Sequence, residues 1–172
     1  MTSALHDRIH DEARAYTGNA DRPLAAYSGL MALYATSVAG ISVAARLTRR
    51  TLPSPSPWDL MLNTLATHQL SRLIAKDPVT SPLRAPFTRF EGTSGPAELE
   101  EDVRGTGARK AVGEMLTCPF CIGLWAATAC TAGSVFAPRA TRLATATLAT
   151  LAGADFLQFA RAAAQHAAEE SS

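Results

Sequence analysis

The sequence predicts an all-α protein, a small helical membrane bundle of three to four hydrophobic helices, one of them amphipathic. Three stretches of the 172-residue chain are nearly free of charge: residues 24–45 carry no charged side chain, residues 111–138 carry only Glu114, and residues 143–160 carry only Asp155. Each stretch is long enough to cross a bilayer core of about 30 Å at about 1.5 Å per helical residue. We find no internal repeat, and no segment with the alternation of apolar and polar residues that predicts a strand.

The overall composition agrees with this fold class and excludes one class of partner. Hydrophobic residues make up 47% of the chain and charged residues 18%, which is below the roughly 25% of an ordinary soluble domain. A net charge of +1 gives no general attraction to nucleic acid. The mean hydropathy of +0.04 is low for a protein with several spans, so a soluble Ala-rich bundle is the alternative.

The chain divides into a polar N-terminal tail (1–22), a helical membrane domain (23–163) with a loop at 77–110, and a polar C-terminal tail (164–172). The first apolar segment begins too far from the N-terminus to be a signal peptide. Three cysteines are too few for a disulfide framework, so we expect reduced thiols. In the loop, four prolines and an acidic run predict a solvated segment with at most a short helix after Pro96.

The first apolar segment and the helix predicted after it differ in character. Residues 24–45 present a stripe of small residues that favours close packing of membrane helices. A stiff, proline-rich connection follows, and residues 58–76 then form an amphipathic helix that either crosses the membrane or lies at its surface. Trp58 and Trp125 are expected at the interface. The stripe consists of Ala32, Thr36, Gly40 and Ala44.

The distribution of Lys and Arg predicts the orientation. With four crossing helices and an inside N-terminus, eleven of the sixteen basic residues lie in the cytoplasm, and the best three-helix arrangement gives the same division. Charge therefore leaves three and four spans open. Both arrangements put the 77–110 loop and the Cys118 and Cys121 pair on the cytoplasmic side of the membrane.

Three ordered motifs carry a family resemblance. They are Ser71-Arg72-Leu73-Ile74-Ala75-Lys76-Asp77, Ser81-Pro82-Leu83-Arg84-Ala85-Pro86-Phe87 and Cys118-Pro119-Phe120-Cys121-Ile122-Gly123-Leu124-Trp125. Together they resemble a family of small bacterial membrane proteins called domain of unknown function 1360, over about residues 57–160. The resemblance implies an integral membrane protein of bacteria, with some relatives in spore-forming lineages, and it implies no activity.

The pair Cys118 and Cys121 admits three interpretations: redox chemistry, half of a metal site, or helix packing. Pro119 suits a first helical turn, so Cys118 is expected near an N-cap, where free backbone N–H groups favour a thiolate. No strand precedes the motif, which argues against a thioredoxin-like fold. A metal would need further ligands, such as His68 or a second protomer, because Cys130 lies about 13 Å further along the helix.

A polar cluster is expected inside the membrane. Asp155 is costly at that depth, so we hypothesise an ion pair between Asp155 and Arg72, with His68 and Ser71 nearby. Such a pair would fix helix register, and a proton path is the less favoured alternative. In the loop, Arg84 and Arg89 with Phe87 and Phe90 either bind anionic lipid headgroups or belong to an ordinary solvated loop.

These observations favour a non-enzymatic structural or interaction component of the bacterial cytoplasmic membrane. The alternative is a membrane thiol oxidoreductase in which Cys118 is the nucleophile and Cys121 the resolving thiol. A transporter along His68, Arg72 and Asp155 would require an oligomer. The expected partners are the lipid bilayer and other membrane proteins or further copies of the chain. No cofactor is predicted unless a metal is bound by Cys118 and Cys121 with His68.

Overall fold

A computed structural model describes residues 2–18 and 20–170, and the chain in it is mostly helical. The elements are α1 (Thr2–Thr17), α2 (Leu24–Leu47), α3 (Pro57–Lys76), a 3-10 turn η1 (Pro78–Thr80), α4 (Ser81–Arg84), β1 (Thr88–Gly95), β2 (Glu98–Val103), α5 (Gly107–Thr117), α6 (Pro119–Phe136) and α7 (Pro138–Glu170).

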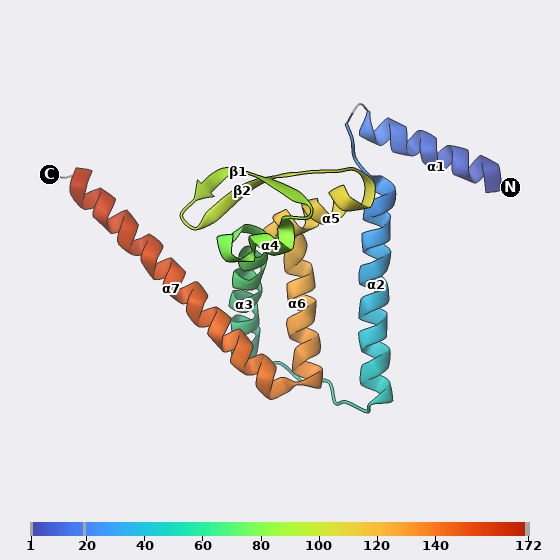
Figure 1. Cartoon of the computed structure of the whole chain (residues 1–172). Helices are drawn as coiled ribbons and strands as arrows, with labels where there is room; N and C mark the ends of the chain where they lie inside the picture. The colour runs from blue at the N-terminus through green and yellow to red at the C-terminus, as the bar shows by residue number, and fades with distance from the viewer. Residues whose placement is uncertain (1, 19, 171–172) are drawn as a thin grey trace.

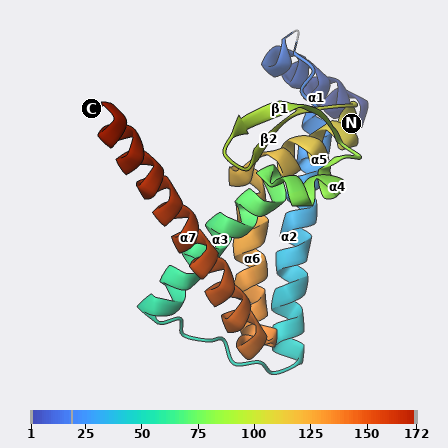
Figure 2. The same ribbon diagram turned by 60° about the vertical axis from the view of Figure 1, so that its left-hand side comes forward.

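Four long helices run up and down in chain order (Figure 1). The helices α3, α6 and α7 pack against one another, and α2 stands at the outer side of α6. The hairpin β1–β2, α4 and α5 lie together at the end of the bundle where α2 begins and α3 ends. The far half of α7 diverges from the other helices, as both views show (Figures 1 and 2).

Three helices in the described part of the chain are long and apolar enough to cross a membrane: α2, α6 and α7. The amphipathic helix α3 runs beside them but is not among the candidate spans. The apolar segment predicted at 111–138 is divided at Cys118 into α5 and α6. The 18 residues of α6 span about 27 Å at about 1.5 Å per residue.

The core between α3, α6 and α7 is built from small side chains. Five alanines from these three helices are at most 8% exposed, and a Cβ on Gly133 of α6 would lie 2.5 Å from Thr141 of α7. Small residues allow such close approach of helices. The alanines are Ala66, Ala75, Ala126, Ala149 and Ala152.

The described residues leave most of the small stripe predicted on α2 uncovered, and only Ala44 is half-buried. Ala32, Thr36 and Gly40 are exposed, and a Cβ on Gly40 would meet nothing within 4 Å. Its use as a packing face therefore stays a prediction for a contact with another chain.

The absence of strands was predicted wrongly, since β1 and β2 form an antiparallel hairpin inside the 77–110 segment. The short helix expected after Pro96 is strand β2 instead. Ala97, with φ of +58°, closes the turn after Pro96. Two register irregularities in β1 obscure the two-residue period.

Prolines and short polar side chains set the helix boundaries. Ser56 and Asp59 form a capping box at the start of α3: the Ser56 hydroxyl accepts from the Asp59 amide at 3.2 Å, and Asp59 accepts from the Ser56 amide at 3.2 Å. Pro57, Pro119 and Pro138 begin α3, α6 and α7. Helix α7 continues to Glu170, through the boundary predicted at residue 163.

Candidate functional site

The two thiols of the Cys-x-x-Cys motif lie at the corner between α5 and α6. Cys118 caps α6, as predicted: its Sγ accepts from the Cys121 amide at 3.3 Å. The Cys121 Sγ lies 2.7 Å from the Cys118 Sγ, within hydrogen-bonding distance, and both cysteines are free thiols. The two sulfur atoms therefore lie next to each other at this corner.

The sequence around the motif determines the change of chain direction between α5 and α6. Pro119 has no amide hydrogen and disfavours helical geometry in the residue before it, so α5 cannot continue through Cys118. Cys118 is accordingly extended, with φ of −101° and ψ of 108°. Its position places the sulfur beside the first backbone amides of α6, where negative charge is stabilised.

A cavity of about 740 Å³ lies beside the thiols, between α2, α5 and α6; we refer to it as the thiol cavity. All three tyrosines of the chain line it, together with one of the two tryptophans, and the rest of the wall is largely apolar. Cys121 contributes to the wall, whereas Cys118 is not among its lining residues. The aromatic residues are Tyr16, Tyr27, Tyr34 and Trp125.

Polar contacts at one end of the thiol cavity connect α2 and the residues just before it to α5. Glu114 accepts a hydrogen bond from the Tyr27 hydroxyl and lies 3.3 Å from a guanidinium nitrogen of Arg22. Outside the cavity, the Lys110 ammonium lies 3.1 Å from the carboxylate of Asp21. Glu114, the one charge of its apolar segment, thus has two partners from the chain around the start of α2.

Trp125 is half-buried and packs edge to face on Tyr34, with ring centroids 5.2 Å apart. The Tyr34 hydroxyl is 2.9 Å from the Thr128 hydroxyl. Trp125 is therefore part of the cavity wall between two candidate spans, while Trp58 is 62% exposed at the start of α3, as an interfacial anchor would be.

The predicted ion pair between Asp155 and Arg72 is wrong, because each residue has another partner. The Gln69 amide donates to Asp155 at 2.9 Å, and Arg72 donates to Glu98 of the hairpin at 2.6 Å. The prediction failed because it treated the segment after α3 as a loop and so placed no carboxylate above Arg72. Of the other two predicted members, Ser71 is buried on the side of Gly123 in α6, and His68 stacks on Phe156 of α7.

The structure does not bring the weak metal candidates together with further ligands. Among the side chains that the structure describes, those of residues 8, 11–18 and 20–170, no group of three or more His, Cys, Asp or Glu is placed to hold a metal. His68 lies against α7, while Cys121 lines the cavity on the α2 side of α6.

Arg84 is fully buried, so both of its predicted settings, at lipid headgroups and in an ordinary solvated loop, are wrong. Its guanidinium donates to the Ile74 carbonyl at 2.7 Å, to the Asp77 carbonyl at 3.1 Å, to the Thr80 hydroxyl and to the Glu101 carboxylate. We call this set the arginine clamp. It joins the last carbonyls of α3 to α4 and to strand β2, and so fixes the hairpin on the bundle.

Sequence reasoning missed the clamp because an arginine in a proline-rich segment is usually solvated. The available signal was its place inside a family motif, seven residues after the end of the preceding one. Arg89, in contrast, is exposed on β1 and remains available at the surface.

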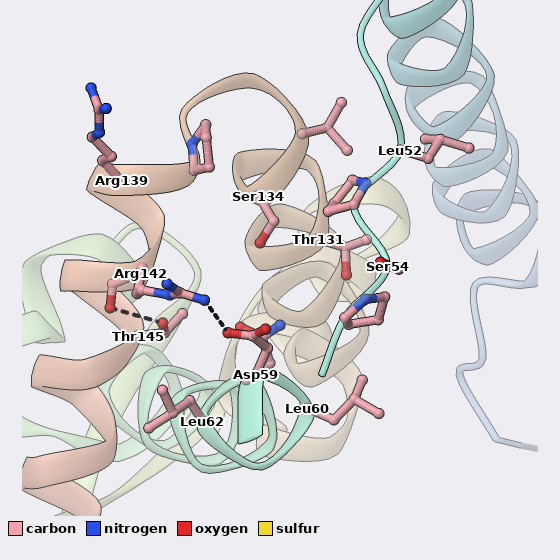
Figure 3. Close-up of a pocket in the computed structure, with 15 residues that line it drawn as sticks. Leu52, Ser54, Asp59, Leu60, Leu62, Thr131, Ser134, Arg139, Arg142 and Thr145 are labelled. Atoms are coloured by element: carbon pink, nitrogen blue, oxygen red, sulfur yellow. Dashed lines mark hydrogen bonds and ion pairs between the residues drawn. The ribbon is translucent and has the colours of Figure 1, made fainter. Parts of the chain in front are cut away.

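A second cavity, of about 580 Å³, lies at the opposite end of the bundle, between the proline-rich connection, α6 and α7. Figure 3 shows Arg142 directed toward Asp59, at 2.8 Å, and Arg139 directed away from it. The hydrogen bond from Arg142, with those from Ser56, lowers the pKa of Asp59 to about 2. This ion pair connects the start of α3 to the start of α7.

Comparison with known proteins places the chain in a family. Residues 61–161 match the family described as protein of unknown function, DUF1360. The chain belongs to this family. A similar curated protein is the sporulation protein YjcA of Bacillus subtilis (strain 168), 35% identical over 71 residues, a match that covers 40% of this chain and 60% of that relative. No solved structure matches the chain.

The segment that matches the family covers only part of the candidate site. It contains the arginine clamp, both thiols and most of α7, while α1 and α2 lie outside it. The α6 wall of the thiol cavity is therefore inside the matched segment, and the α2 wall is not.

Proposed function

We propose that this DUF1360 protein is an integral protein of the bacterial cytoplasmic membrane. Three helices support this, because they are long and apolar enough to cross a bilayer and bury few of their residues within the chain. In the most apolar window of α2 only 6% of the residues are buried. An apolar surface of this size needs lipid or other helices around it. Alkaline carbonate extraction tests the proposal, and release of the chain into the supernatant would contradict it.

The proposed orientation puts the hairpin and the thiols in the cytoplasm. The thiol end of the bundle also contains the hairpin, the start of α2 and the end of α3 (Figure 1). Five arginines lie in the segments at the other end, in agreement with the division of charge expected for an inside N-terminus. A membrane-impermeant thiol reagent should leave Cys121 unlabelled in intact cells and label it in inverted vesicles.

Within the membrane we propose a non-enzymatic interaction component. The observation that carries this is the exposed stripe of small residues on α2, a surface suited to close contact with another helix. A photo-crosslinking residue at Thr36 should capture a partner helix or a second copy of the chain. The same residue at Leu30, which is half-buried and lines the thiol cavity, is the matched control. Equal crosslinking at both positions would contradict a specific interface.

The relationship to the B. subtilis protein, whose name describes a sporulation protein, suggests a phenotype to measure. We propose that spore formation be scored first in a deletion strain of a spore-forming host, with the membrane protein composition measured beside it.

A second candidate function is a membrane thiol oxidoreductase. The distance of 2.7 Å between the two sulfurs and the N-cap position of Cys118 support it. Cys118 would attack a partner's sulfur and Cys121 would resolve the mixed disulfide. Acid trapping of a Cys121→Ser variant should reveal a mixed disulfide through Cys118. A pair that stays reduced under every growth condition would remove this candidate.

A further inference from the structure

We infer that the thiol cavity binds a lipid-soluble quinone, which accepts the two electrons of the Cys118 and Cys121 pair. The inference rests on the second candidate function, because it supplies the acceptor that a membrane thiol oxidoreductase requires. It depends on the walls of the cavity, on its position between two candidate spans, and on which thiol faces it.

The shape and lining of the cavity suit a flat ring with a hydrocarbon tail. A volume of about 740 Å³ falls in the range of small-molecule sites. The hydroxyls of Tyr27 and Tyr34 already bond to Glu114 and Thr128, so these residues offer their rings to a ligand. Aromatic rings favour stacked or edge-to-face contact with another ring.

The location favours a ligand that reaches the site from the bilayer. The cavity lies between α2 and α6, both of which are long and apolar enough to cross a membrane. Leu24, Leu30 and Leu124 add aliphatic wall along these helices. At one end Arg22, whose side chain is 55% exposed, offers guanidinium donors suited to a quinone carbonyl.

The two thiols are oriented for different reaction partners. Cys121 lines the cavity, while Cys118 caps α6 outside the set of lining residues. A quinone in the cavity therefore meets Cys121, and a partner protein meets Cys118.

The thiol pair and the quinone together balance the oxidation of the thiols. Each S–H bond breaks, one S–S bond forms, and the two electrons and two protons released convert the quinone to the quinol. A partner dithiol then reduces the Cys118–Cys121 disulfide, which is the exchange of the second candidate function run in reverse: one partner thiolate attacks the Cys118 sulfur and expels the Cys121 thiolate, and the other partner thiol breaks this mixed disulfide, so that the partner leaves as a disulfide.

The test uses the full-length protein, reduced and without oxygen, in lipid nanodiscs, with decylubiquinone as the probe. In a Trp58→Phe background the remaining tryptophan is Trp125, and its fluorescence should be quenched saturably by the quinone. The number of free thiols should fall from three to one, because Cys130 is not part of the pair, with one quinol formed per chain.

Two alanines of α2 give a matched pair of variants. Ala35→Trp fills the cavity and should slow oxidation by the quinone about tenfold or more, since ligand and side chain compete for one volume. Ala39→Trp, one turn further along at an exposed position that does not line the cavity, should leave the rate within about twofold. Diamide, a soluble oxidant, should oxidise both variants at the wild-type rate.

The outcomes separate the quinone from the thiol function. Equal rates for the two variants, absence of saturable quenching, or binding without loss of thiols would overturn the quinone site. If diamide nevertheless closes the pair and Cys118 traps a partner, the thiol function stands without the quinone. If diamide also leaves all three thiols free, both the quinone site and the thiol function are refuted.

Discussion

The arginine clamp permits a quantitative prediction. Replacing Arg84 with Met removes four donated hydrogen bonds and leaves the Glu101 carboxylate, whose side chain is 6% exposed, without its cation. Breaking a buried ion pair by removing one partner costs about 3–5 kcal/mol. Because the clamp holds the hairpin on α3, we expect the cost to appear as local opening of β1 and β2.

Hydrogen exchange followed by mass spectrometry measures this opening. At about 1.4 kcal/mol per factor of ten, protection of the hairpin amides should fall by at least about 100-fold, provided that the wild-type hairpin is protected by more than this. Arg89→Met, on the exposed face of β1, is the control and should change protection by less than about threefold.

A double variant distinguishes the loss of the pair from a general loss of packing. Arg84→Met combined with Glu101→Leu replaces the buried pair with apolar side chains, which is often neutral, and should recover a large part of the lost protection. If Arg84→Met exchanges no faster than Arg89→Met, the clamp does not hold the hairpin and this reasoning is refuted.

Three further changes test other parts of the fold. The pKa of Asp59 is lowered from 3.8 to about 2, so its stabilising effect is present above about pH 4 and is lost as the pH falls toward 2. Asp59→Asn should therefore reduce the drop in melting temperature between pH 5 and pH 2 in detergent; an unchanged drop would argue against the ion pair with Arg142. Gly113→Ala should cost about 1–3 kcal/mol in chemical unfolding, because its Cβ would lie 2.7 Å from Val103 and 3.2 Å from the Phe87 carbonyl oxygen. Gly92→Ala meets nothing within 4 Å and is its control, so equal losses would be inconsistent with the contact. Gln69→Leu removes the donor to Asp155 and should cost about 1–3 kcal/mol, most of it recovered by adding Asp155→Leu, as a double-mutant cycle would measure; additive losses would show that the two side chains do not interact.

The helices were predictable from sequence because their signals are local. Segments nearly free of charge located α2, α6 and α7, and the amphipathic pattern with its prolines located α3. The N-cap role of Cys118 followed from Pro119 alone. Each of these predictions depends on a few neighbouring residues and on the backbone rules that govern them.

The hairpin and the polar contacts were not predictable in the same way. Strand β1 contains Gly92 and Gly95 and has two register irregularities, so its two-residue pattern is weak. Once the hairpin was missed, Glu98 and Glu101 had no position, and the partners of Arg72 and Arg84 could not be found. Long-range pairing decided these contacts, and single-sequence periodicity carries little information about it.

The division of the thiol cavity between α6 and α2 has a consequence for how such proteins diversify. The helix that begins at the two cysteines lies within the segment shared with the family, whereas the helix that closes the cavity opposite them lies outside it. The two are joined through α5 by polar contacts at one end. Exchange of α2 alone would therefore alter which molecule fits beside Cys121 while leaving the cysteines, the corner and the clamp untouched. In the proposed quinone site, ligand preference and thiol chemistry would then be separable.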